Sequence, residues 1–169
     1  MSQNAQAYQW VDDSNPRLEG GCRCGTTRVN LRDKPLFVHA CHCLTCQKNT
    51  GSAFGITTIM LESDIELIQG SLIVKAIEQA PHRHRHLCST CGEQLYSTAT
   101  NHPRSAIFRV GSLDDPRRIT INAHIFTKRK HDWLVLPDNV LQFPELYDRQ
   151  TTWPEESLKR LAAAIKADS

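Results

Sequence analysis

The sequence has no long apolar run and no apolar core near its N-terminus. A membrane-spanning helix needs roughly 18 consecutive apolar residues, and no stretch of the 169 residues approaches that length. Residues 1–17 are polar and lack the apolar segment of a secretory signal. Internal repeats and low-complexity tracts are also missing. We therefore expect a cytoplasmic protein with no membrane partner, a flexible tail over residues 1–17 and one domain after it.

The cysteines are odd in number, which argues against a framework of disulfides. A secreted disulfide protein would leave one of the seven thiols stranded. All seven fall into three clusters, whereas cysteines used as small core residues would be scattered. Clustered thiolates are typical of soft metal ions, and zinc is the first choice for such a site. The clusters are Cys22-Arg23-Cys24, Cys41-His42-Cys43-Leu44-Thr45-Cys46 and Cys88-Ser89-Thr90-Cys91.

Seven ligands divide naturally into four and three. A closed structural zinc site has four protein ligands, and a catalytic site commonly has three and an open position. The two outer clusters are short turns, each followed by a glycine, and together they would supply four thiolates. We therefore expect two zinc ions per chain. The predicted structural ligands are Cys22, Cys24, Cys88 and Cys91, and the predicted catalytic ligands are Cys41, Cys43 and Cys46.

The central cluster lacks a fourth cysteine, so its fourth position stays open in the prediction. A side chain fills that position, or it is left for water or a substrate thiol. His42 lies between two predicted ligands in an extended turn, and we expect its ring to point away from the ion. Two alternatives are a purely structural zinc and a set of free thiols, which could act as a redox sensor.

Net charge does not indicate a nucleic-acid partner. The formal charge is +2 when the cysteines are counted as neutral. Seven thiolates and two zinc ions would bring that value to about −1, so the basic surplus is cancelled by the predicted metal sites. We expect the basic run Lys128–Lys130 to be a solvated loop, with a nucleic-acid contact as the alternative.

Residues 82–86 (HRHRH) alternate strictly, which is typical of a strand. The three histidines would share one face and the two arginines the other. We interpret the segment as an exposed strand, with a metal-binding histidine ladder as the alternative. Arg83 or Arg85 could instead line a pocket for a carboxylate, because a guanidinium fork suits that geometry. Lys48 is either solvated or attracts an anionic substrate.

The hydrophobic pattern predicts a mainly β domain and a C-terminal helix. Gly70-Ser71 is expected to turn a hairpin between Ile65–Gln69 and Leu72–Ile77. Residues 152–155 resemble a capping box, and an apolar stripe at helical spacing follows. We expect the stripe to pack on the domain, with a homodimer contact as the alternative. Further strands are expected at residues 26–32, 36–40, 54–61, 94–99, 106–110 and 119–126, a helical turn at 47–51, and the stripe at Leu158, Leu161, Ala162 and Ile165.

Three cysteine motifs occur in order: residues 21–25 (GCRCG), residues 41–54 (CHCLTCQK, then GSAF) and residues 88–92 (CSTCG). Together they resemble the glutathione-dependent formaldehyde-activating enzyme (GFA) family, which includes the centromere protein V domain. The resemblance runs from Leu18 to Tyr147. His124 and the Trp133–Phe143 segment look like the closing strand of the family and its Leu-Pro-x-Phe-like ending.

The resemblance implies the β-tent fold of the family, with zinc knuckles, over residues 18–147, and it leaves residues 148–169 as a helical tail. It implies the same division of the cysteines, with the outer four on a structural zinc and the central three on a catalytic zinc. It also implies that the protein joins formaldehyde to the thiol of glutathione and gives S-hydroxymethylglutathione, which is a carbon–sulfur lyase reaction run in reverse.

The residues themselves are compatible with that chemistry. Zinc in an open three-cysteine site can bind a fourth thiol as the thiolate and can polarise a carbonyl oxygen. We therefore predict a zinc-dependent carbon–sulfur lyase that acts on a small thiol and an aldehyde. The alternative is a non-catalytic zinc module that binds a protein or a nucleic acid, with Lys128–Lys130 as the contact.

Overall fold

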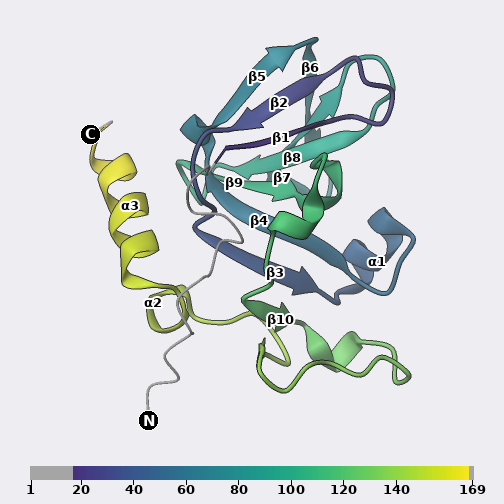
Figure 1. Cartoon of the computed structure of the whole chain (residues 1–169), viewed down its shortest axis with the longest axis vertical. Coiled ribbons are helices and arrows are strands. Elements are labelled where there is room, and N and C mark those ends of the chain that lie inside the picture. The colour runs from purple at the N-terminus through teal and green to yellow at the C-terminus, as the bar shows by residue number, and fades with distance from the viewer. Residues whose placement is uncertain (1–16, 168–169) are drawn as a thin grey trace.

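Two β-sheets form the centre of the computed structural model, which describes residues 17–167 (Figure 1). The smaller sheet has the strand order β1-β2-β5, and the larger has the order β11-β10-β3-β4-β9-β8-β7-β6. The predicted mainly β fold is confirmed. The small-sheet strands are β1 (Leu18–Gly21), β2 (Arg28–Leu31) and β5 (Ile65–Gln69). Those of the large sheet are β3 (Phe37–Cys41), β4 (Gly55–Leu61), β6 (Leu72–Ile77), β7 (Ala80–Cys88), β8 (Gln94–Ala99), β9 (Ser105–Arg109), β10 (Ala123–Ile125) and β11 (Leu141–Gln142).

Helices lie outside the sheets. In Figure 1, α1 and α3 lie on opposite sides of the view. No helix in residues 17–167 has the length and apolar character that crossing a bilayer requires. The predicted tail, residues 1–17, falls outside the described residues except for Arg17. The α-helices are α1 (Leu44–Thr50), α2 (Arg149–Thr152) and α3 (Glu155–Lys166), and the 3₁₀ helices are η1 (Glu62–Asp64), η2 (Val110–Ser112), η3 (Pro116–Arg118) and η4 (Thr127–Arg129).

The large sheet has a hydrophobic core on each face. Successive side chains of a strand point to opposite faces, so on β4 Met60 belongs to one core and Ile59 to the other. The inner core lies between the two sheets and joins Met60 to Val29 of the small sheet. The outer core joins Ile59 to Trp153 and Leu161 of the C-terminal segment. The face to which a side chain belongs therefore decides whether it meets the small sheet or the C-terminal helix.

The predicted hairpin at Gly70-Ser71 is wrong. β5 pairs with β2 in the small sheet, and β6 pairs with β7 in the large one. The chain therefore crosses between sheets at this point. Gly70 makes the crossing possible, because its φ is +79° and a Cβ there would lie 2.4 Å from the carbonyl oxygen of Thr26.

The C-terminal helix is present, but its start differs from the prediction. The predicted capping box does not form, because Thr152 ends α2 and Pro154, with an extended ψ of 141°, precedes the first residue of α3. Leu161 is buried and Leu158 packs beside it in the outer core, so this part of the stripe covers the domain as expected. Ile165 is 39% exposed. The homodimer contact and the division at residue 147 stay predictions.

Candidate metal centres

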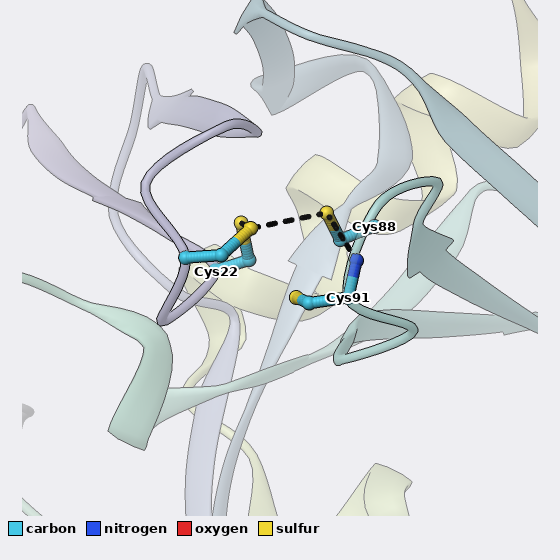
Figure 2. Close-up of side chains that lie close together, drawn as sticks. Cys22, Cys88 and Cys91 are labelled. Atoms are coloured by element: carbon cyan, nitrogen blue, oxygen red, sulfur yellow. Dashed lines mark hydrogen bonds between the residues drawn. The ribbon is translucent and has the colours of Figure 1, made fainter.

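The four outer cysteines come together at one end of the two sheets. Their sulfurs all lie within 4.8 Å of one another. Cys22 and Cys24 follow β1, and Cys88 and Cys91 lie at the end of β7 and in the turn after it. Figure 2 shows sulfurs from these two separate loops turned toward a common point. The cluster therefore links the small sheet to the large one.

Hydrogen-bond donors surround the sulfur of Cys88. The Thr27 hydroxyl lies 3.2 Å from it, and the backbone N–H groups of Thr90 and Cys91 lie at 3.4 and 3.5 Å. The hydrogen bond from Thr27 is the main reason why the pKa of Cys88 falls to about 5. Thr27 also donates its backbone N–H to the Cys22 sulfur at 3.2 Å. These donors favour the thiolate form, which is the form that binds metal.

The three central cysteines form a second cluster, with sulfurs that also lie within 4.8 Å of one another. Cys41 ends β3 and is buried, while Cys43 and Cys46 are partly exposed. Cys43 is the N-cap of α1, and its sulfur accepts a hydrogen bond from the Cys46 N–H at 3.4 Å. The helix thus begins earlier than predicted and includes Cys46. A hydrogen bond with Cys46 and burial raise the pKa of Cys41 well above its usual range.

Gly55 of the large sheet lies next to Cys46 of α1. Gly55 is directly opposite Cys41 in the antiparallel pair of β3 and β4. A Cβ at this position would lie 3.5 Å from the Cys46 Cβ and 3.9 Å from its sulfur. Gly55, like Ile59 four residues on, points to the outer face. The central cluster therefore lies on the outer face of the sheet, opposite to the inner core that contains Cys88.

Two neighbouring residues, His42 and Gln47, hold the central loop in place. The fully buried His42 ring has its Nε2 3.0 Å from His124 Nδ1, and the His42 N–H donates to the Ile125 carbonyl. The Gln47 side chain donates to the carbonyls of both His42 and Arg129, at 2.8 and 2.9 Å. These contacts attach the loop to β10 and to the segment after it. His42 is not in the group of side chains that could share an ion.

Both clusters fit the requirements of zinc. In a zinc tetrahedron with Zn–S bonds of about 2.3 Å, the sulfurs lie about 3.8 Å apart. In the outer cluster, Cys24 and Cys88 are separated by 3.8 Å and Cys22 and Cys24 by 3.3 Å. All seven cysteines are free thiols. The outer set could enclose an ion with four sulfurs, and the central set could offer three.

Other candidates from the sequence have different surroundings. On β7, His86 stacks on Tyr96 and bonds to Thr98. In residues 17–167, the two cysteine clusters are the only groups of His, Cys, Asp or Glu that could share an ion.

Lys48 is exposed. In the basic run, Lys128 pairs with Glu145 and Lys130 donates to the Leu134 carbonyl. Lys128 and Arg129 are exposed, as expected for a solvated loop, and the nucleic-acid contact stays an alternative.

Three residues that lie near the two clusters could not be identified from the cysteine motifs. Thr27 contacts two sulfurs of the outer cluster, although the sequence indicates only that it belongs to a strand. His124 was noted only for its place in the closing strand, yet it contacts His42. Arg109 lies on the same face as the central cluster. The alternation of β9 could have placed Arg109 on a face, but only the strand register shows which residues lie beside it.

Parts of the chain are similar to known proteins. A Sordaria macrospora protein is 27% identical over 81 residues, which cover 44% of this chain and 34% of that protein. An Aspergillus terreus protein is 23% identical over 99 residues, which cover 55% and 52%. Both are named "Putative glutathione-dependent formaldehyde-activating enzyme". The chain therefore spans about half or less of the length of these curated relatives.

A crystal structure of a Rhodobacter sphaeroides protein is similar at 20% identity, with a TM-score of 0.47, over 59% of this chain and 93% of that one. The family model described as "Glutathione-dependent formaldehyde-activating enzyme" matches residues 17–129, which include all seven cysteines. Because this match spans well over half of the sequence, the chain belongs to the GFA family.

Proposed function

We propose that the protein is a zinc-dependent carbon–sulfur lyase that forms or cleaves the adduct of a thiol and an aldehyde. Glutathione and formaldehyde are the expected pair, because the family is named for them. The observation that supports the proposal best is the incomplete central cluster. It gathers three thiols within 4.8 Å, and two of them, Cys43 and Cys46, are partly exposed.

In the proposed assignment, each cluster has one task. Cys41, Cys43 and Cys46 hold the catalytic zinc, and the four outer cysteines hold the structural zinc. A zinc ion bound by three thiolates can lower the pKa of a fourth thiol and polarise a carbonyl oxygen. The contacts of His42 and Gln47 keep the three thiols of the central loop together, since they attach the loop to two different segments.

The proposed reaction is balanced without an oxidant or a reductant. The thiol gives up its proton, and its sulfur forms a bond to the carbonyl carbon of formaldehyde. The π electrons of the carbonyl move to oxygen, which takes up a proton, and the product is the S-hydroxymethyl thioether. Both reactants are small, so holding them together supplies much of the advantage over the reaction in solution.

The test is an exchange measurement by NMR with ¹³C-formaldehyde and glutathione, combined with zinc analysis of the same sample. We expect two zinc ions per chain and faster exchange between the free aldehyde and its adduct than in buffer. Cys43→Ala should return the exchange rate to the value in buffer. The matched control is Thr45→Val, because Thr45 is exposed on the same helix and is not one of the clustered thiols. Exchange as fast in Cys43→Ala as in the wild type would overturn the assignment.

A further inference from the structure

Arg109 lies beside the central cysteine cluster on the outer face of the large sheet. It is directly opposite Thr57 in the pairing of β9 with β4. Thr57 is two residues from Gly55, above which the Cys46 sulfur lies. Diagonal neighbours across two antiparallel strands are about 7–8 Å apart. An arginine side chain can span that distance, so the guanidinium reaches the neighbourhood of the cluster.

The Arg109 guanidinium is partly buried without a carboxylate partner. Within residues 17–167, its one hydrogen bond is a long one, 3.4 Å to Gln94 Oε1, and it forms no ion pair there. Burial lowers the pKa of Arg109, while the nearby Glu93 and Cys46 act in the opposite direction. Glu93 acts on Arg109 through its charge, while one of its carboxylate oxygens accepts a hydrogen bond from the Arg23 N–H at 2.6 Å. Partial burial makes the charge of Arg109 less favourable, and an anion bound beside it would offset part of that cost.

A second arginine lies on the same face. Arg85 is opposite Ser97, which is opposite Ile107, and Ile107 precedes Arg109 by two residues on β9. Residues opposite each other in an antiparallel sheet point to one face. Arg85 also acts on Arg109 electrostatically and opposes its charge. Two like charges held close to each other favour the binding of an anion between or beside them.

We propose that Arg109, supported by Arg85, binds a carboxylate of the thiol substrate, so that the enzyme selects acidic thiols over neutral ones. This inference rests on the proposed function, because it takes the central cluster as the place where the substrate sulfur binds. A guanidinium fork and a carboxylate match in geometry, and the bond between them is charge-assisted. Arg109 is thus a specificity-determining residue, and Arg85 contributes less.

Kinetics with two thiols test the proposal. Glutathione carries carboxylates, whereas 2-mercaptoethanol carries none. Loss of a charge-assisted hydrogen bond should raise KM for glutathione in Arg109→Gln by roughly 10- to 100-fold. KM for 2-mercaptoethanol should stay within about twofold, because no bond to a carboxylate is lost. Arg85→Gln should give a smaller change with the same selectivity, and Arg109→Lys should recover part of it.

The control is Arg117→Gln, because the Arg117 side chain is 88% exposed and pairs with Asp115, two residues earlier. It should not change either KM. An equal rise of KM for both thiols in Arg109→Gln would overturn the inference while the lyase proposal stands. Thermal unfolding of each variant shows whether the fold is intact.

Binding of S-methylglutathione, which keeps both carboxylates but has no free thiol, separates the two proposals. We expect NMR titration to show binding that Arg109→Gln weakens by about tenfold or more. If the wild type turns over neither thiol but binds this probe through Arg109, the lyase proposal fails and the carboxylate site stands. Binding that is equal in wild type and variant, or missing in the wild type, would overturn the carboxylate site.

Discussion

The two cysteine clusters differ in how they are built into the fold. The outer cluster joins loops that are 64 residues apart in sequence, and it connects the small sheet to the large one. The central cluster lies within one segment of six residues and on the opposite face of the large sheet. Loss of the first would remove one of the links between the two sheets, which the inner core also joins. Loss of the second would disturb one loop and a short helix, so the fold can tolerate an open position there.

The hydrogen-bond donors around the sulfurs also differ between the two clusters. In the outer cluster, Cys22 and Cys88 are buried in the inner core and receive hydrogen bonds from Thr27. In the central cluster, Cys43 receives a single backbone hydrogen bond from within its own helix. Burial alone does not separate the clusters, because Cys24 is exposed and Cys41 is buried. The outer cluster differs in the number of donors to its sulfurs, which favour tight binding of an ion.

The largest effect is expected from Cys91→Ser. Zinc binding in zinc-finger peptides is worth about 10–16 kcal/mol, which is comparable to the whole stability of a domain, about 5–15 kcal/mol. Loss of one of four thiolates should therefore leave the chain unfolded or insoluble. Circular dichroism and zinc content of the purified variant measure this. A folded variant that keeps two zinc ions would contradict the structural role of the outer cluster.

Cys43→Ala should remove one zinc ion and keep the fold. The sulfur also caps α1, so the variant should lose about 0.5–2 kcal/mol through the missing cap alone. Cys43→Ser is the matched variant, because its hydroxyl can replace the cap without supplying a thiolate. Both variants should contain one zinc ion per chain by elemental analysis. Unfolding of both would show that the central cluster is as structural as the outer one.

Gly70→Ala should destabilise the crossing between the sheets, close to the outer cluster. The substitution puts a Cβ against the Thr26 carbonyl at a positive φ, which should cost about 2–4 kcal/mol. Gly111→Ala is the control, since a Cβ there meets no atom within 4 Å. Its effect should be within about 0.5 kcal/mol. Denaturant unfolding measures both, and equal stability of the two variants would contradict the crossing as described.

The smallest effect is expected from Thr27→Val. It removes the hydroxyl, which lies 3.2 Å from both the Cys88 sulfur and the Ser71 carbonyl oxygen, and keeps a β-branched side chain in a fully buried position. Loss of a hydrogen bond to a ligand typically weakens metal binding by about 10–100-fold. Competition with a chelator should show this at the tightly bound ion only. A change confined to the weakly bound ion would show that the structural and catalytic roles of the two clusters are the reverse of those proposed.

The cysteine clusters and most strands could be predicted from the sequence, because both are local patterns. Spacing within a cluster fixes which thiols can share an ion, and β-branched alternation marks a strand. The pairing of β5 and β6 could not be predicted. Alternation gives the faces of a strand but not its partner, so Gly70-Ser71 was compatible with a hairpin as well as with a crossing.

Contacts between distant segments also could not be predicted from the sequence. Thr27 and Cys88 are 61 residues apart, and their contact depends on how the two sheets pack. Arg109 was hidden for the same reason, since its place beside Cys46 follows from the register of β9 on β4. The sequence offers Arg83 or Arg85 as an alternative candidate for binding a carboxylate, and the structure places Arg85 on the same face as Arg109.

Stepwise removal of zinc from the wild-type protein tests the central claim most directly. A chelator titration would follow zinc content, amide NMR spectrum and formaldehyde exchange in the same samples. We predict that the first ion leaves with loss of the exchange activity while the spectrum stays dispersed, and that the second leaves with unfolding. Unfolding on loss of the first ion, or activity that persists until the second has gone, would contradict the division of tasks between the clusters.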